Sequence, residues 1–439
     1  MKIRDNITFL LSNASFSSTL WLLGERIFKM ALGFLMFALI ARHLGPENFG
    51  ILNYAIAFVT LAISFTSLGL SGLLVKDLVN HPQDRDKLLG SALTMRFVAG
   101  IVALLIITTF LYVTEDNIIA RTVLIIISLR LVLDCLEVID LFFQSIVKSK
   151  FTAISKIIAL IVIFLVNMTL VYMNVSIIGF AVIVVIEFVI IYCLLFAFYI
   201  WNFGSPLRWR FNFTLSKKLL KRSWPLIISG VAAMIYLKSD QIMLRWLDSD
   251  SAVGIYSSAV RLSEVWFFVP VAIVTSQFPS IINAKKQGIE HYNKKLQDIY
   301  TLLFYMALSL AIIVMFIGSP LINIAYGSEY SDGSTILKIH IWTAVFVFLR
   351  ALLSKWLINE DLYIFSLVSH GLGAIANIFL NLWLIPIYGG IGAAVGTFLS
   401  FSISTLLFTF LSKKTRAAGI MMIRAILDPV FRLIGLMKK

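Results

Sequence analysis

The feature that most constrains this chain is a series of long apolar segments, each about as long as a bilayer is thick. A helix needs roughly 20 apolar residues to cross about 30 Å of hydrocarbon. Twelve segments meet this requirement, near residues 19–41, 49–74, 89–113, 118–143, 152–173, 177–200, 223–246, 253–282, 298–325, 335–357, 362–386 and 390–412. Hydrophobic residues make up 60% of the chain and charged residues only 14%, more apolar side chain than a soluble core could bury. The sequence predicts an all-α polytopic membrane protein.

Two of these segments carry local signals about helix geometry. The first segment contains Glu25, Arg26 and Lys29 and ends without a small-residue cleavage site, so we expect a retained helix and not a signal peptide. The eighth and ninth segments are longer than a span requires. Within the eighth, Pro270 is where we expect a kink, because proline removes a helical hydrogen bond.

The distribution of Lys and Arg over the loops predicts the orientation in the membrane. One set of loops and the C-terminal tail carry these residues, for example Lys76, Lys148, Arg210 and Lys285. The opposite loops, such as "HLGPENFG", "VTEDN" and "YGSEYSDGS", contain none. Because positively charged short loops stay in the cytoplasm, we expect both termini to be cytoplasmic. The net charge of +14 is explained by this topology, and we expect no nucleic-acid partner.

The sequence also repeats itself in two places. "RHLGPENFGI" (residues 42–51) follows the first segment and "RWLDSDSAVGI" (residues 245–255) follows the seventh, while "IGFAV" at residues 178–182 matches "IGAAV" at residues 391–395. Gly50 and Gly254 are 204 residues apart, and Gly179 and Gly392 are 213 residues apart. The two separations are nearly equal. Each half would hold six spans, an even number, so the halves would enter the membrane in the same direction. This pattern predicts two parallel six-helix bundles, and the charged residues inside the spans are most simply explained by a hydrated central cavity between them.

Four ordered motifs give the chain a resemblance to a known family. "RHLGPENFGILNYAIAF", "KSDQIMLRWLDSDSAVGIYSSAVRL", "YGSEYSDGSTILKI" and "NIFLNLWLIPIYGGIGAAVGTFLS" resemble the polysaccharide-exporter branch of the multidrug/oligosaccharidyl-lipid/polysaccharide (MOP) superfamily, and within it the O-antigen flippases of Wzx type. The resemblance implies a protein of the bacterial inner membrane that moves undecaprenyl-diphosphate-linked oligosaccharide from the inner to the outer leaflet by alternating access. A polysaccharide polymerase and a chain-length regulator are the protein partners it suggests.

Charged side chains inside the predicted spans are the candidates for binding. Each costs about 2.5 to 3.5 kcal/mol at the centre of a bilayer, so most must face water or one another. Several have acidic neighbours on the same helix, such as Lys29 beside Glu25, and such pairs could be purely structural. Cations suit a diphosphate, and the predicted substrate-binding residues are Arg26, Arg96, Lys238, Arg261 and Arg350.

Acidic residues in the spans are candidates for ion coupling. In "RLVLDCLEVID", the spacing of Arg130, Asp134 and Glu137 places all three on one face of a helix, with Asp140 slightly further round. Clustered carboxylates in a membrane can hold a proton or a cation. Asp134, Glu137 and Asp240 are therefore the predicted coupling residues for H⁺ or Na⁺, and the alternative is a structural network satisfied by Arg130 and neighbouring helices.

The predicted organisation has four parts. Residues 1–205 form an N-terminal six-helix bundle, 206–222 a basic cytoplasmic linker, 223–412 a C-terminal six-helix bundle and 413–439 a basic amphipathic tail. The linker and the tail are expected to lie on the anionic cytoplasmic surface as anchors, without binding sites of their own.

Two other classes of function compete with the flippase. An ion-coupled exporter of drugs or other small molecules, from the same superfamily, would favour an anionic cavity, which the acidic fourth segment could supply. A membrane enzyme would need catalytic groups on a sizeable external loop, and the external loops are each roughly ten residues or shorter. The chain shows no nucleophile–base constellation and no metal-ligand spacing among its five histidines. We therefore expect neither enzyme activity nor a cofactor.

Overall fold

The computed structural model describes residues 14–433, although the side chains of residues 14–29, 31, 236, 363 and 428–433 lie outside that description. Within these bounds the regular structure is helical throughout, without a strand. The chain divides into two compact units, Met1–Met234 (unit 1) and Ile235–Lys439 (unit 2). The division falls inside one helix, α10 (Phe213–Leu247), whereas the predicted bundles, linker and tail were delimited by sequence and stay predictions.

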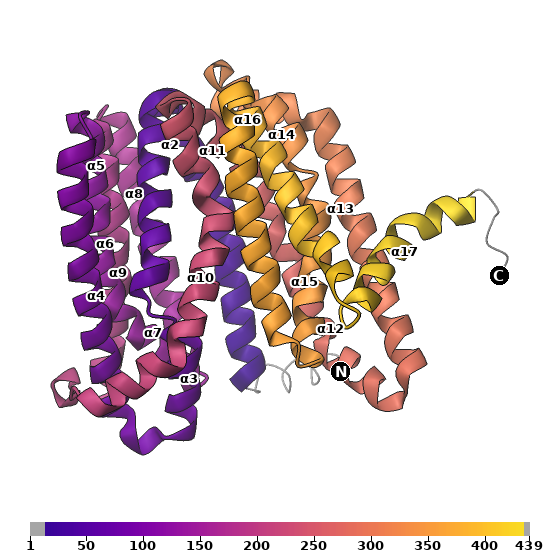
Figure 1. Cartoon of the computed structure of the whole chain (residues 1–439). Helices are drawn as coiled ribbons and strands as arrows, with labels where there is room; N and C mark the ends of the chain where they lie inside the picture. Colours follow the sequence, from indigo (N-terminus) through magenta and orange to yellow (C-terminus); the bar gives the residue numbers. More distant parts are fainter. Residues whose placement is uncertain (1–13, 434–439) are drawn as a thin grey trace, which may run out of the picture. The chain divides into compact units, whose positions relative to one another are not determined.

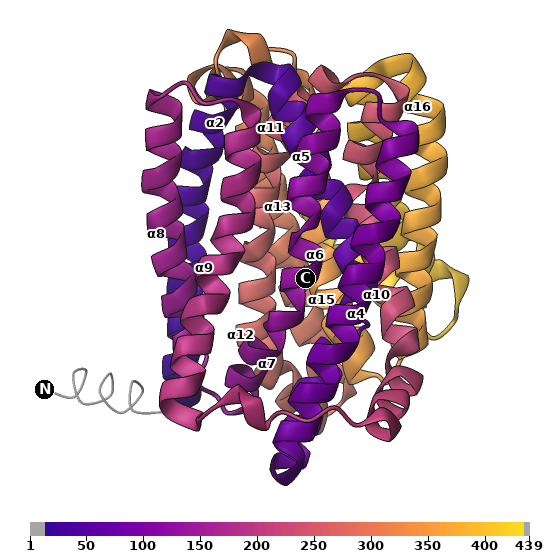
Figure 2. The same ribbon diagram turned by 90° about the vertical axis from the view of Figure 1, so that its left-hand side faces the viewer.

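Unit 1 is built from long helices interrupted by short turns. Its helices are α2 (Ala14–Thr66), α3 (Leu70–Asn80), α4 (Arg85–Thr114), α5 (Ile118–Ser128), α6 (Arg130–Leu133), α7 (Glu137–Ser145), α8 (Lys150–Tyr172) and α9 (Ile177–Phe203), with 3₁₀ turns η1 (Pro82–Asp84), η2 (Asp134–Leu136) and η3 (Pro206–Arg208). Helix α8 packs on both α2 and α9, and α5 packs on α9 (Figure 1 and Figure 2).

Unit 2 continues from the second part of α10. It contains α11 (Asp250–Glu264), α12 (Phe268–Gln287), α13 (Ile289–Tyr326), α14 (Gly333–His340), α15 (Thr343–Asn359), α16 (Tyr363–Thr405) and α17 (Arg416–Leu433), with 3₁₀ turns η4 (Val265–Phe267), η5 (Ser328–Tyr330) and η6 (Leu407–Leu411). Helix α15 packs on α12, α13 and α16, and α11 packs on α14 (Figure 1).

The helices confirm a polytopic membrane protein. Among the described residues, eight helices are long and apolar enough to cross a membrane, or nine if the bent α10 counts as one span. The figure of twelve stays a prediction. Helix α2 has 53 residues, which would extend about 80 Å as one rod against about 30 Å of hydrocarbon. It contains Gly45 with non-helical torsion angles, and α16 contains Gly389 with the same property. Both glycines lie in the loops that the sequence predicts between consecutive spans.

Other breaks fall inside predicted spans. The fourth predicted span is divided into α5, α6, η2 and α7, so it is not one continuous helix. The eighth is divided by η4, directly before the first turn of α12, which holds Pro270. Proline cannot donate a backbone hydrogen bond and its ring clashes with the carbonyl four residues earlier. The interruption at η4 lies where proline geometry favours one, and a kink at Pro270 stays a prediction.

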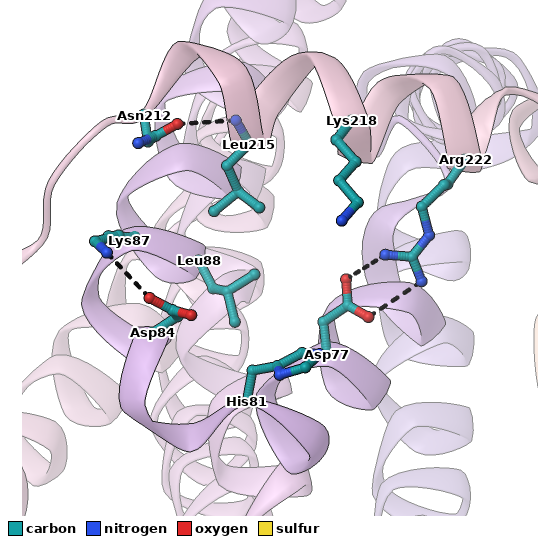
Figure 3. A pocket seen from close by; sticks show the side chains of 9 residues that line it. All are labelled: Asp77, His81, Asp84, Lys87, Leu88, Asn212, Leu215, Lys218 and Arg222. Carbon is teal, nitrogen blue, oxygen red and sulfur yellow. Dashed lines mark hydrogen bonds and ion pairs between the residues drawn. The ribbon is translucent and has the colours of Figure 1, made fainter.

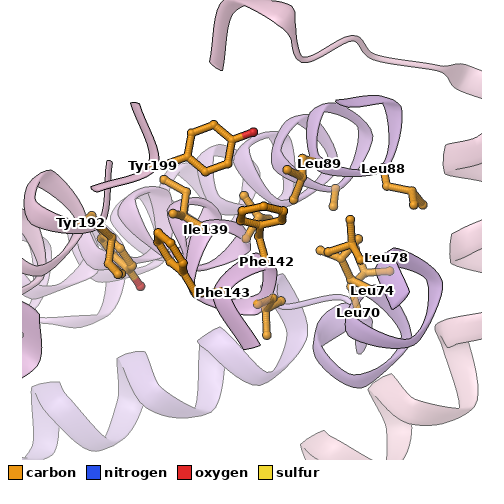
Figure 4. Packing of buried hydrophobic residues seen from close by; sticks show 14 of the residues in the cluster. Leu70, Leu74, Leu78, Leu88, Leu89, Ile139, Phe142, Phe143, Tyr192 and Tyr199 are labelled. Carbon is orange, nitrogen blue, oxygen red and sulfur yellow. The ribbon is translucent and has the colours of Figure 1, made fainter. Parts of the chain in front are cut away.

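A hydrophobic cluster holds one end of unit 1 together (Figure 4). Leucines of α3 and α4 pack there against Phe142 and Phe143 of α7 and against Tyr199 of α9. Phe142 meets Tyr199 edge to face with ring centroids 5.2 Å apart, an arrangement that aromatic quadrupoles favour. This cluster therefore holds the ends of α3, α4, α7 and α9 together.

The predicted linker is attached to this same end of unit 1. The indole of Trp209 donates a hydrogen bond to the hydroxyl of Tyr199 at 2.9 Å. The backbone N–H of Arg210 donates to the carbonyl of Asp86 at 3.1 Å. Gly90 is required where they meet, because a Cβ there would lie 2.6 Å from the Arg210 backbone. The linker is thus packed on α4 and α9.

In unit 2, the predicted amphipathic tail begins with α17. Ala418, Met422 and Ala425 of α17 are buried, and the helix packs on α13 and η6. The amide of Gln297 on α13 donates a hydrogen bond to the carbonyl of Met421 at 3.1 Å. The expected location at the membrane surface stays a prediction, and residues 434–439 of the tail lie outside the described range.

Candidate functional site

The predicted anion ligand Arg96 lies at the middle of unit 1, on α4. Only 1% of its side chain is exposed. One turn further along, Gly100 lets α4 approach the fourth predicted span, because a Cβ at Gly100 would lie 2.3 Å from the carbonyl oxygen of Leu131. Arg96 is therefore held against that span, which carries the predicted coupling residues.

Arg96 pairs with both coupling candidates in unit 1. Its Nη2 donates to Oε2 of Glu137 at 2.5 Å and to Oδ2 of Asp134 at 3.2 Å. The two acids point the same way because Asp134 begins the 3₁₀ turn η2, and residues three apart eclipse one another in a 3₁₀ helix. Nε and Nη1 of Arg96 are buried without a hydrogen-bond partner in the described part of the chain. The structure thus joins a predicted substrate ligand and two predicted coupling residues in one ion-pair cluster.

Arg130 and Asp140 are directed to other helices. The guanidinium of Arg130 lies over the ring of Phe188 on α9, 3.8 Å from its centroid. Asp140 accepts hydrogen bonds from Thr152 at 2.8 Å and Lys156 at 3.2 Å, both on α8. Arg130 stays within electrostatic reach of Asp134 and Glu137, as their spacing predicts, although η2 interrupts the helix between them and the ion pairs that the described residues show at these two acids come from Arg96. The cation that reaches the two acids comes from α4.

Unit 2 holds the third coupling candidate, Asp240, in a different environment. Asp240 lies on α10 and is 4% exposed. Its Oδ1 accepts hydrogen bonds from the amides of Asn377 at 2.9 Å and Asn381 at 2.7 Å. Its Oδ2 accepts from the hydroxyl of Tyr256 at 2.6 Å and from that of Thr397. Four neutral donors from α11 and α16 therefore surround one carboxylate.

The fold of α16 explains how these donors meet. Asn377 and Asn381 are four residues apart and lie on one helical face. Beyond Gly389 the chain returns: a Cβ at Gly392 would lie 2.3 Å from the carbonyl of Leu384, and one at Gly396 would lie 2.4 Å from Oδ1 of Asn381. Small residues four apart allow such close helix packing in membranes. The two arms of α16 thus place Asn381 and Thr397 on the same carboxylate.

No Lys or Arg whose side chain the structure describes forms an ion pair with Asp240. A small cavity of about 10 Å³ adjoins the cluster, lined by Asp240, Gln241, Glu264 and His340 among others. That volume is about the minimum that one water-sized particle needs. His340 in turn shares a hydrogen bond of 2.6 Å with the hydroxyl of Ser263. The carboxylate therefore has room for a small ion beside it and no cationic side chain against it.

The other predicted substrate ligands lie apart from these two clusters. Arg350 of α15 is buried and donates to the carbonyl of Ser404 at 2.8 Å and to the hydroxyl of Ser369 at 3.0 Å. Arg261 on α11 is exposed and Lys238 on α10 is half-buried. The side chain of Arg26 lies outside the described residues.

Sequence reasoning missed the neutral ligands of Asp240. These ligands carry no charge and lie in apolar segments, so a search for charged residues does not find them: Tyr256, Asn377, Asn381 and Thr397. One signal was available: two asparagines spaced four apart in "NIFLN" (residues 377–381), on one face of a membrane helix. Polar amides in such a position need partners, because unsatisfied groups in hydrocarbon cost several kcal/mol.

Comparisons with known proteins agree with the motifs. The model of the family described as "Polysaccharide biosynthesis protein" matches residues 15–285. In sequence, the probable flippase AglR of Haloferax volcanii is 30% identical over 189 residues, 41% of this chain and 38% of that protein. A candidate O-antigen transporter of Shigella dysenteriae is 25% identical over 185 residues, 40% of this chain and 44% of that protein. The chain thus spans about two fifths of the length of these relatives.

In structure, the similarity extends over nearly the whole chain. The lipid II flippase MurJ in an inward closed conformation matches with a TM-score of 0.71 and 17% identity, over 96% of this chain and 93% of that chain. An inward-facing multidrug resistance transporter of the MATE family, from the MOP superfamily, matches with a TM-score of 0.63 and 12% identity, over 90% and 95%. At these identities the comparison shows the fold.

Proposed function

Because the chain belongs to the polysaccharide biosynthesis protein family, we propose that it is a flippase that moves a lipid-linked glycan across the membrane. The observation that carries this proposal is the combination of a family match over residues 15–285 with relatives named as flippases. The fold agrees, since it is similar to that of a lipid II flippase over 96% of the chain.

The proposed substrate is an undecaprenyl-diphosphate-linked oligosaccharide, such as an O-antigen repeat unit, moved from the inner to the outer leaflet of the bacterial inner membrane by alternating access. Support comes from the O-antigen transporter candidate among the relatives and from the cations in the membrane segments. Arg261 and Lys238, which are at least partly exposed, are the proposed contacts for the diphosphate. Arg96 serves as an internal counter-ion to Asp134 and Glu137.

Coupling to H⁺ or Na⁺ is proposed to occur at Asp240. Two carboxylate oxygens, two hydroxyls and two amide side chains converge there, and hard cations prefer such oxygen ligands. The assignment of oxygen and nitrogen in Asn377 and Asn381 is interchangeable, so either amide can turn its oxygen to a cation. A proton bound to the Asp240 carboxylate would neutralise the same negative charge as a bound cation.

An exporter of drugs or small molecules is the second candidate, favoured by the fold shared with MATE transporters. Deletion of the gene separates the two. A flippase deletion leaves lipid-linked repeat units on the cytoplasmic leaflet and removes the surface polysaccharide, with unchanged drug tolerance. Cells that still display full-length polysaccharide, in a strain without a second flippase, would refute the glycan assignment, and increased drug sensitivity would establish the exporter.

A further inference from the structure

A pocket of about 280 Å³ lies at the end of unit 1 where α3 ends and both α4 and α10 begin (Figure 3). Its volume is close to the lower end of the range of about 300–1,000 Å³ for small-molecule sites. The polar residues around it are Asp77, His81, Asp84, Lys87, Lys218 and Arg222, with Asn212 at one side. The hydrophobic cluster beneath, which includes Leu78 and Leu88, gives the pocket a packed base.

The pocket is lined by one more cationic side chain than acidic side chains. Arg222 binds Asp77 through two hydrogen bonds of 2.8 and 3.2 Å, and Lys87 binds Asp84 at 3.1 Å. Lys218 has no ion-pair or hydrogen-bond partner among the described side chains, and in Figure 3 its amine points into the space above Asp77. The pocket therefore has a net positive charge, with the surplus at Lys218.

The two faces of α10 differ in the way expected of a helix at the level of lipid headgroups. Leu215, Lys218 and Arg222 share the face that lines the pocket. On another face lie Phe213, which is 73% exposed, and Trp224, which is 56% exposed, with Lys217 between them along the chain. Exposed aromatic residues mixed with lysines are typical of the interface between hydrocarbon and water. A helix of this composition is expected to lie close to lipid headgroups, which would bring a lipid phosphate within reach of the pocket.

We propose that this pocket binds the phosphate group of a membrane lipid, with the ammonium of Lys218 as its main ligand and the free N–H groups of Arg222 as its second. An ammonium offers three donors to phosphate oxygens, and a guanidinium that holds one carboxylate keeps further N–H groups available. Two lipids carry this chemistry: a bilayer phospholipid, or the diphosphate-linked lipid of the proposed function. This site was not expected from the sequence, which suggested only a surface anchor here.

The test is a lipid titration of the purified, delipidated full-length protein in low-salt detergent solution, followed by its thermal unfolding. The probes are short-chain phosphatidylglycerol, short-chain phosphatidylethanolamine, undecaprenyl diphosphate and inorganic phosphate. Lys218→Gln is compared with Lys217→Gln, which removes the same charge from the neighbouring residue outside the pocket. We expect Lys218→Gln to weaken lipid binding about tenfold, Lys217→Gln to change it by less than about twofold, and Lys218→Arg to retain most of it.

The probes also distinguish the two lipids. Binding of phospholipids but not of undecaprenyl diphosphate assigns the pocket to a bilayer lipid, and the reverse assigns it to the transported lipid; either result supports the site. Equal losses in the Lys217 and Lys218 variants would reveal general surface attraction and overturn the proposal, as would unchanged binding in Lys218→Gln or equally tight binding of inorganic phosphate. Because transport is not measured, a negative result leaves the proposed function standing.

Discussion

Units 1 and 2 both bury carboxylates in membrane helices, but they neutralise them in opposite ways. In unit 1, Asp134 and Glu137 share the guanidinium of Arg96. In unit 2, Asp240 is surrounded by hydroxyls and amides. A buried ion pair holds both partners charged, since separating them would leave a charge in a medium of low dielectric constant. A carboxylate with neutral donors keeps its net charge and can exchange a proton or a cation. We therefore propose that the first cluster contributes stability and that the second is the site of ion coupling.

The contrast is sharper because the two units share their backbone breaks. Val147 and Asp361 both have positive φ, and they occupy equivalent turns after the fourth and tenth predicted spans. Asn174 and Gly389 do the same one span later. The fourth span is broken at η2, and the tenth between α14 and α15. These shared breaks agree with the predicted repeat, whereas the charged side chains of the two units differ.

The largest effect is expected from the removal of Arg96. Arg96→Ala would leave the buried Asp134 and the half-buried Glu137 without their cation, at a cost of about 3–5 kcal/mol in the free energy of unfolding. Thermal unfolding of the purified protein measures this loss. The combination of Arg96→Met, Asp134→Asn and Glu137→Gln should recover most of the stability, since it removes all three charges together. A single variant as stable as the parent would show that the cluster contributes little.

Next in size is the effect of neutralising Asp240. Asp240→Asn should abolish the dependence of transport on sodium or pH, because the charge that attracts the ion is gone. If sodium is the ion, the parent protein should gain about 2.7 kcal/mol of stability at a hundred times its Kd, and the variant none. The matched control is the triple variant Arg96→Met, Asp134→Asn and Glu137→Gln, which leaves none of these charges unpaired and in which ion dependence should persist. Loss of ion dependence in the control but not in Asp240→Asn would show that the coupling residues lie in unit 1.

A smaller effect is expected at the packing contact that supports the Asp240 cluster. Gly396→Ala would place a methyl group 2.4 Å from Oδ1 of Asn381 and should cost about 1–3 kcal/mol by overpacking. Gly371→Ala on the same helix is the control: no atom lies within 4 Å of its Cβ position, so the better helix propensity of alanine should stabilise slightly. Unfolding measurements that ranked the two variants in the opposite order would contradict the close packing of the α16 arms.

The smallest effect concerns Arg130, which stacks on Phe188. A double-mutant cycle with Arg130→Met and Phe188→Leu should give a coupling energy of about 0.5–2 kcal/mol, the range for cation–π pairs. The same cycle with Asp134→Asn in place of Phe188→Leu should give a smaller value. A larger coupling energy with Asp134 than with Phe188 would show that Arg130 interacts mainly with the acidic cluster, as its sequence spacing suggested.

The sequence by itself determined the class of this protein, the family it resembles and many of the breaks between and within its helices. The bilayer requires about 20 consecutive apolar residues for each span, so hydropathy alone identifies membrane helices. Glycine and proline act on the backbone next to them, so the breaks at Gly45 and before Pro270 also follow from local sequence. These properties depend on neighbours along the chain, and a linear sequence contains them.

The tertiary structure decided which cation meets which acid. Arg96 reaches Asp134 from 38 residues away, because Gly100 brings α4 against the broken fourth span. Arg130, four residues before Asp134 in sequence, turns instead to an aromatic ring. The ligands of Asp240 come from α11 and from the two arms of α16, and they include no charged residue. Charge, spacing and hydropathy describe one helix at a time, whereas an ion site depends on the distance between side chains that only packing brings together.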